Sequence, residues 1–191
     1  NKDCSSDCCV ALPLWPRRRH KMRNGVWLGL LTILLDQLSK WVVVEKLMRP
    51  DNVTETPFYV ITTFKITPFF DLVMAWNRGV SFGMFNNGDS RANVWILTVL
   101  SLVICSGLVV WMLRSKETLL RLGLAMIVGG ALGNVIDRVR FGAVADFLDV
   151  HVAGYHWPAF NIADSGITIG AMLLLADALF RPSPAGKDPA A

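Results

Sequence analysis

The sequence predicts an all-α membrane protein with four transmembrane helices, a small extracytoplasmic β-sheet, and both termini in the cytoplasm. The composition favours a membrane protein, because 53% of the 191 residues are hydrophobic and only 18% are charged, whereas a soluble domain carries about 25% charged residues. Seven tryptophans suit a chain that meets two membrane interfaces. The net charge of +4 is too small to indicate a nucleic-acid partner.

Four apolar runs of about the length of a bilayer are predicted to cross the membrane, over residues 26–44, 92–113, 119–136 and 162–180. The second run contains no charged residue and is the clearest of the four. The third run contains Gly129 and Gly133, whose spacing of four residues lets another helix approach closely. The runs therefore predict a packed bundle of four helices.

The first run is interrupted by Asp36 and Lys40, which stand four residues apart with the acid first. This order favours an ion pair on one face of a helix, and pairing lowers the cost of burying both charges. Two interpretations stay open, a structural ion pair and a pair that contacts a substrate directly.

The segments between the runs carry strand patterns. Residues 59–67 are rich in β-branched and aromatic side chains and residues 71–77 form a second candidate strand, so we expect a sheet at about 55–77 on the membrane surface. Residues 77–85 contain two glycines and are predicted to turn back to the membrane. Residues 144–152 alternate in polarity, which predicts a further strand. One face of that strand would be formed by Val144, Asp146, Leu148 and Val150.

The side of the membrane that holds the termini is the more basic one. Residues 1–23 form a basic tail next to the first run, which we interpret as an anchor at the inner leaflet rather than a nucleic-acid patch. The excess of Lys and Arg on this side places both termini in the cytoplasm. Residues 24–180 are then the membrane domain and residues 181–191 a disordered tail. The tail cysteines, at positions 4, 8 and 9, match no familiar zinc spacing.

Polar residues from distant parts of the chain are predicted to meet on the outer side of the membrane. They are Asn77, Asn134, Asp137, Arg138, Asp146, Asn161 and Asp164. The sequence has no evident Ser-His-Asp set, catalytic cysteine or phosphate loop, so paired carboxylates are the remaining chemistry. Two carboxylates that share one proton can act as acid and base towards a water molecule. Acidic residues at the edge of the hydrocarbon also favour a functional interpretation, because burying them is costly.

Each of these residues also has a structural interpretation. Asn161 and Asp164 precede an apolar run with the spacing of a capping box, in which two side chains satisfy the first turn of a helix. Asn134 and Arg138 stand four residues apart and can pair at a helix end. Asp137 can be a surface acid. His151 and His156 lack a third ligand at a suitable spacing, so we expect no metal site and no cofactor.

Five segments together resemble the bacterial lipoprotein signal peptidases, also called signal peptidase II. They are D-Q-L-S-K from residue 36, N-R-G-V-S-F-G from 77, G-G-A-L-G-N-V-I-D-R from 129, G-A-V-A-D-F from 142 and F-N-I-A-D-S from 160. The resemblance covers residues 26–180 and implies an aspartyl protease of the bacterial inner membrane with four helices. Such an enzyme removes the signal peptide of prolipoproteins just before a diacylglyceryl-modified cysteine.

The resemblance also implies roles for individual residues. The catalytic aspartates of the family fall on Asp146 and Asp164. Supporting or substrate-binding positions fall on Asp36, Lys40, Asn77, Gly79, Asn134, Asp137, Arg138, Asn161 and Ala163. We expect Arg138 to bridge the loop of Asp146 to the end of the third helix through the forked geometry of its guanidinium. The sequence departs from the family pattern at residues 80–81, where Val-Ser follows the motif glycine.

The expected partners are a diacylglyceryl-modified prolipoprotein and membrane lipid, with no nucleic acid, and we expect a monomer whose active site faces away from the cytoplasm. Two other classes of protein are weighed against this. A small transporter or proton-relay protein would use the same carboxylates, but it needs polar residues spread along the spans. A scaffold held together by glycine packing has no need of paired aspartates.

Overall fold

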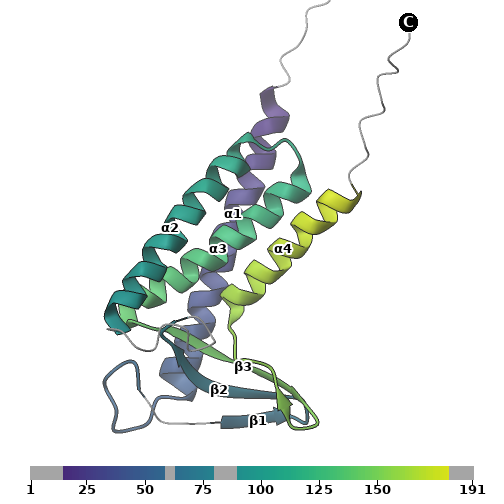
Figure 1. The fold of residues 1–191 in the computed structure, drawn as a ribbon. Helices are drawn as coiled ribbons and strands as arrows, with labels where there is room; N and C mark the ends of the chain where they lie inside the picture. The colour runs from purple at the N-terminus through teal and green to yellow at the C-terminus, as the bar shows by residue number, and fades with distance from the viewer. Residues whose placement is uncertain (1–14, 59–62, 80–89, 181–191) are drawn as a thin grey trace, which may run out of the picture.

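The computed structural model describes residues 15–58, 63–79 and 90–180, and these form a helix bundle with a small sheet at one end (Figure 1). The α-helices are α1 (Trp15–Trp41), α2 (Ser90–Arg114), α3 (Thr118–Phe141) and α4 (Ile162–Phe180). A π-helical segment, η1 (Val42–Leu47), continues α1. The start of α1 and the end of α4 lie at the same end of the bundle, opposite the sheet.

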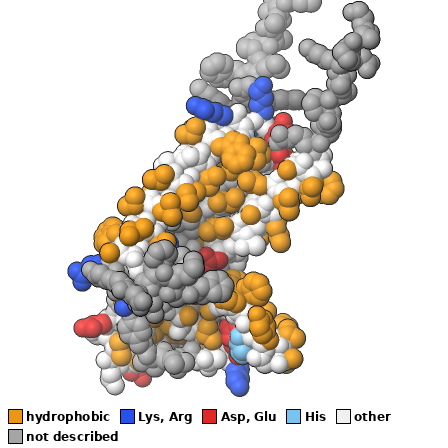
Figure 2. Space-filling model, viewed as in Figure 1, with side chains coloured by type: hydrophobic (Ala, Val, Ile, Leu, Met, Phe, Trp, Pro, Cys, Tyr) orange, Lys and Arg blue, Asp and Glu red, His pale blue; other side chains and the backbone are white. Residues whose placement is uncertain are grey.

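Four helical segments are long and apolar enough to cross a membrane, namely Arg23–Leu47, Arg91–Arg114, Thr118–Phe141 and Ile162–Phe180. Large apolar side chains on them point outward, among them Leu34, Ile96, Val103 and Leu179. Figure 2 shows hydrophobic side chains over the helical part and charged side chains towards its two ends. This distribution suits a bilayer around the bundle and confirms the four predicted spans.

Helix α3 lies at the centre of the bundle and packs against the other three helices. Its glycines make this possible. A Cβ atom on Gly129 would lie 2.6 Å from the carbonyl oxygen of Gly29 in α1, and one on Gly130 would collide with the carbonyl oxygen of Ala163 in α4. The predicted close approach at the small residues of the third span is confirmed, because these positions have room only for a hydrogen.

The sheet has four antiparallel strands in the order β1-β2-β3-β4. They are β1 (Thr63–Thr67), β2 (Phe70–Asn77), β3 (Val144–Val152) and β4 (Tyr155–His156). Strand β2 pairs with β3, with Ala75 opposite Asp146 and Asn77 opposite Val144. Two stretches far apart in sequence therefore meet along one ladder.

A hydrophobic cluster joins the sheet to the end of the first helix. Val43 and Val44 of η1 are buried against Phe58, Ala145 and Phe147. The strand predicted over residues 144–152 is confirmed as β3, but this contact keeps its burial from alternating. Its residues 144–147 are all buried, because the cluster covers the Ala145 and Phe147 side while polar groups of the bundle cover the other.

Two predicted boundaries differ in the structure. Helix α3 does not end at residue 136 but continues to Phe141, so Asp137 and Arg138 are helical. The sheet is not confined to residues 55–77, because β3 and β4 extend it. The first strand is described only from Thr63, since residues 59–62 lie outside the described part of the chain, as do both tails and residues 80–85 of the predicted turn.

Candidate active site

Asp146 lies in β3 with only 3% of its surface exposed. The side-chain amide of Asn161 donates to Oδ1 at 2.7 Å, and that of Asn77, at the end of β2, donates to Oδ2 at 3.1 Å. The amide oxygen of Asn77 accepts the backbone N–H of Gly79 at 3.1 Å, so the turn after β2 holds this amide in place. Both carboxylate oxygens are thus oriented by neutral donors.

Asp164 lies in the first turn of α4 and takes part in capping that helix. The backbone N–H of Asp164 donates to Oδ1 of Asn161 at 3.0 Å, and the backbone N–H of Asn161 donates to Oδ2 of Asp164 at 3.2 Å. This reciprocal pair is the predicted capping box. The other oxygen, Oδ1, accepts the side-chain amide of Asn134 of α3 at 2.8 Å. Capping and site formation therefore use the same two residues.

The two aspartates come together because the chain before α4 bonds to β3. The backbone N–H of Phe160 donates to the carbonyl of Leu148 at 3.0 Å, and the N–H of Leu148 donates to the carbonyl of Phe160 at 2.8 Å. Asn161 follows directly and is fully buried. It reaches Asp146 with its side chain and Asp164 with its backbone, so one residue bridges both carboxylates.

A buried ionic cluster between α1 and α3 lies next to this pair of aspartates. Lys40 Nζ lies 2.8 Å from Oδ2 of Asp36 and 2.8 Å from Oδ2 of Asp137, and the lysine is only 3% exposed. It also donates to Oδ1 of Asn134 at 3.0 Å. The ion pair predicted between Asp36 and Lys40 is confirmed. Because Asn134 in turn bonds Asp164, the charge of Lys40 is one residue removed from the pair.

Backbone N–H groups donate to the remaining carboxylate oxygens of this cluster. Oδ1 of Asp36 accepts the N–H of Ala163 at 2.9 Å, and Oδ2 of Asp137 accepts the N–H of Ala145 at 3.2 Å. Gln37, which sequence reasoning did not single out, donates to Asp36, Asp137 and the carbonyl of Gly133. Asp36 and Asp137 are consequently both paired and hydrogen-bonded, as burial requires.

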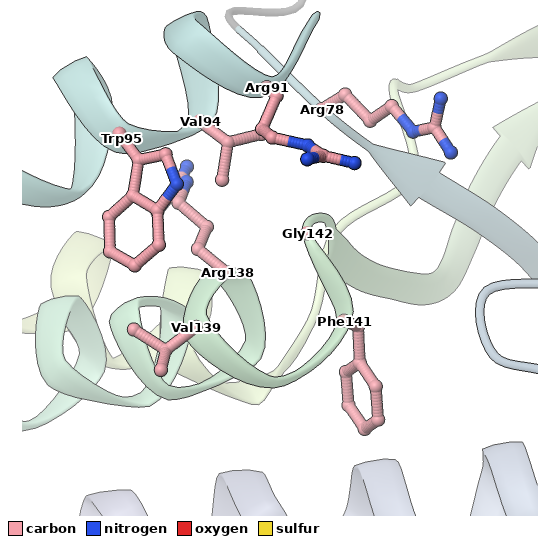
Figure 3. A pocket seen from close by; sticks show the side chains of 8 residues that line it. All are labelled: Arg78, Arg91, Val94, Trp95, Arg138, Val139, Phe141 and Gly142. Carbon is pink, nitrogen blue, oxygen red and sulfur yellow. The ribbon is translucent and has the colours of Figure 1, made fainter.

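Arg138 does not make the predicted contact. Its Nη1 donates only to the backbone carbonyl of Asn134, at a long 3.4 Å, and its buried Nε has no acceptor among the described residues. No hydrogen bond to Asp146 is formed within the described part of the chain. Its side chain instead lines a second cavity with Val94 and Trp95 of α2, as Figure 3 shows.

Burial raises the pKa of Asp146 to about 7, and the nearby charge of Asp164 adds to the rise. The hydrogen bonds from Asn77 and Asn161 favour the charged form and so lower the pKa, but burial and the charge of Asp164 outweigh them. A carboxyl group with such a pKa is half protonated near neutral pH. The site can therefore hold one acid and one base at the same time.

Both aspartates open into a cleft of about 600 Å³. The rest of its lining is Asn77, residues 157–160, Ser165, Thr168 and Ile169. One wall is thus the outward face of α4, and the other is the chain that leads from the sheet into that helix. A segment of extended chain can lie in this cleft beside the two carboxylates.

Within the described residues, no group of three metal-binding side chains is close enough to hold an ion. The two histidines considered at the sequence level pair with acids of the sheet instead. His151 Nε2 lies 3.3 Å from Oδ2 of Asp71, and His156 Nδ1 lies 2.7 Å from Oδ2 of Asp149.

Comparison with known proteins agrees with this arrangement. The family described as Signal peptidase (SPase) II matches residues 28–180. The lipoprotein signal peptidase of Methylobacterium radiotolerans is 41% identical over 174 residues, which are 88% of this chain and 96% of the relative. The lipoprotein signal peptidase of Ralstonia nicotianae is 45% identical over 161 residues, covering 82% and 86% of the two chains.

Solved structures agree as well. A bacterial membrane enzyme solved by the in meso method has a TM-score of 0.67 at 26% identity, covering 84% of this chain and 95% of the other. A second such enzyme has a TM-score of 0.69 at 24% identity, with coverage of 88% and 95%, and supports the fold alone. Since the family match extends over most of the chain and includes both aspartate motifs, the chain belongs to the signal peptidase II family.

Proposed function

We propose that this protein is an aspartic-type endopeptidase that removes signal peptides from prolipoproteins, cutting just before a lipid-modified cysteine. The relatives named above are lipoprotein signal peptidases. The observation that carries the proposal is the bridging of Asp146 and Asp164 by Asn161, within one cleft. The two carboxylates are the groups that carry out the chemistry.

The roles of the two carboxylates follow from their surroundings. Asp146, whose pKa is raised to about 7, holds the shared proton, and Asp164 takes a proton from a water molecule in the cleft. The resulting hydroxide attacks the carbonyl carbon while Asp146 donates to the carbonyl oxygen. The proton held by Asp164 then passes to the leaving nitrogen as the C–N bond breaks, and one hydroxyl of the tetrahedral intermediate returns its proton to Asp146 as the product carboxyl group forms. The titration belongs to the pair rather than to either residue alone.

The surrounding amides act as positioning residues. Asn77 and Asn161 fix the plane of the Asp146 carboxylate, and Asn134 fixes that of Asp164. Lys40 holds Asn134 in turn. Fixed geometry of this kind contributes to rate by keeping the reacting atoms aligned before the chemical step.

The place of the cleft favours a substrate that carries a lipid. The cleft lies where α4 begins, and its wall includes the exposed Ile169, one to two turns into a membrane span. A peptide bond reaches this depth if its chain is anchored there. A diacylglyceryl group supplies such an anchor, since each buried CH₂ contributes about 0.8 kcal/mol. From the excess of basic residues around the termini, we place the cleft on the extracytoplasmic side of the inner membrane. We further propose that the protein acts as a monomer.

A transporter or proton-relay protein is less well supported. It needs polar side chains spread along the spans, whereas the buried acids and amides gather at the sheet end of the bundle. They are Asp36, Asp71, Asn134, Asp137, Asp146, Asp149 and Asn161.

The direct test is cleavage of a prolipoprotein by the purified protein in detergent micelles. A lipidated substrate and the same sequence without lipid are compared at equal concentration, with the Asp164→Asn variant as control. We expect cleavage before the modified cysteine of the lipidated substrate only, and none with the variant. Equal rates for both substrates would show that lipid is not recognised. Turnover by a folded Asp164→Asn variant would remove that residue from the chemistry.

A further inference from the structure

A second cavity, of about 440 Å³, lies at the sheet end of the bundle and shares no lining residue with the aspartate cleft (Figure 3). Three arginines from three different elements line it. Arg78 follows β2, Arg91 stands in the first turn of α2, and Arg138 stands in the last turn of α3. The rest of the lining is apolar or glycine, namely Val94, Trp95, Val139, Phe141 and Gly142. No acidic side chain lines the cavity among these residues, so its chemistry is that of an anion site.

Arg138 is the arginine of this cavity with an unsatisfied buried donor in the described part of the chain. Its Nε is buried and has no acceptor among the described residues. The carboxylates of Asp137, Asp146 and Asp164 act on it through space. However, each of them is already bonded elsewhere, Asp137 to Lys40 and the other two to side-chain amides. Because Nε itself is closed off from solvent, an acceptor oxygen in the cavity would bond the Nη groups of this guanidinium.

The cavity lies at the depth of lipid headgroups. Arg91 is the first residue of the span Arg91–Arg114, and Arg138 is three residues from the end of the span Thr118–Phe141. Trp95, about one turn into α2, is 53% exposed, and Val139 is 57% exposed. A half-exposed tryptophan at the end of a span is typical of the membrane interface. The positive end of the α2 dipole also points to this region and favours an anion.

We propose that this cavity binds the phosphate group of an anionic phospholipid. Arginine matches phosphate well, because its planar fork can donate two parallel hydrogen bonds. The apolar side chains at the rim, Trp95 and Val139, offer a surface for the first carbons of an acyl chain. The phosphate chemistry is shared with free inorganic phosphate, but the lipid-facing rim favours a lipid as the source.

The test measures binding to the full-length protein in a neutral detergent. The probes are dioctanoyl phosphatidylglycerol, dioctanoyl phosphatidylcholine and inorganic phosphate, and the readout is the dissociation constant from titration followed by native mass spectrometry. Arg91→Gln removes one cationic group of the cavity. Arg114→Gln is the matched control, because it makes the same change at the opposite, exposed end of the same helix. Arg78→Gln repeats the test in case Arg91→Gln fails to fold.

Phosphatidylglycerol is expected to bind the wild type and Arg114→Gln equally, and Arg91→Gln or Arg78→Gln about tenfold more weakly, as for the loss of one hydrogen bond to a charged group. Phosphatidylcholine is expected to bind more weakly than phosphatidylglycerol. Equal affinity of wild type and both cavity variants for phosphatidylglycerol overturns the site. Equal affinity for the two lipids overturns the preference for an anion. Inorganic phosphate binding as tightly as phosphatidylglycerol overturns the lipid as the source. None of these outcomes depends on peptidase activity, so failure here is distinct from failure of the proposed function.

Discussion

Replacing Asp146 with asparagine should inactivate the protein and yet make it more stable at neutral and alkaline pH. The fold raises the pKa of this carboxyl from an ordinary 3.8 to about 7, chiefly through burial. A folded-state pKa above the unfolded one means that the folded protein binds the proton more tightly. The contribution to stability is therefore fully present below pH 3.8 and is lost as the pH rises through about 7.

The magnitude follows from the same two values. Each pH unit between them corresponds to about 1.4 kcal/mol, so the full interval is worth about 4 kcal/mol. Asparagine carries no charge and does not suffer this loss. It does place an NH₂ group against the amide donor of Asn77 or Asn161, which costs on the order of 1 kcal/mol at every pH. The free energy of unfolding of the variant relative to the wild type should thus rise by about 4 kcal/mol from pH 4 to pH 8. The pH-independent cost of the asparagine does not change this difference.

The assay is thermal unfolding in detergent at a series of pH values, followed by tryptophan fluorescence. For a chain of this size, about 4 kcal/mol corresponds to a relative change in midpoint on the order of 10 °C. Asp51→Asn, at an exposed turn, controls for the loss of one negative charge and should run parallel to the wild type. If the Asp146→Asn curve were also parallel to the wild type from pH 4 to pH 8, the reasoning about the raised pKa would be wrong.

Three further outcomes are expected. Lys40→Met should lower the free energy of unfolding by roughly 3–5 kcal/mol, because it leaves two buried carboxylates without their cation. Lys116→Met, at an exposed site, should cost little. Equal unfolding midpoints of the two variants would contradict the role of Lys40. Gly130→Ala should reduce both activity and stability, because the new Cβ would meet the carbonyl of Ala163. Gly107→Ala, with open space around it, should be tolerated. Melting curves and cleavage rates of the two variants test this difference. Chelators should leave cleavage unchanged, and a loss of activity that zinc restores would refute the carboxylate mechanism.

Much of the site could be predicted from the sequence because its signals are local or periodic. The apolar runs give the spans, the spacing of Asp36 and Lys40 gives the ion pair, and the Asn161–Asp164 spacing gives the capping box. The capping interpretation and the functional one were treated as alternatives. In the structure the hydrogen bonds of the cap also orient the carboxylate of Asp164, so both interpretations apply to the same atoms.

What could not be predicted depends on contacts between distant segments. Hydropathy ends the third span at residue 136, because the residues that follow are charged. The helix continues because Asp137 finds Lys40 and Gln37 on α1. Gln37 gave no signal, since a lone amide in an apolar run has no charge pattern. Likewise, the contacts of the Arg138 side chain depend on where the longer α3 ends, and no local sequence pattern predicts that end.

The bridging residue Asn161 also has a consequence for how the enzyme is made. One carboxylate of the pair, Asp146, is synthesised before the last transmembrane segment, whereas the other, Asp164, is part of it. A nascent chain whose last helix has not yet docked against α3 lacks one of the two carboxylates to which we assign the chemistry. Neither Asn134 nor Asp146 then has its contacts with this helix start. Docking of the last segment is therefore the step that brings the two carboxylates together.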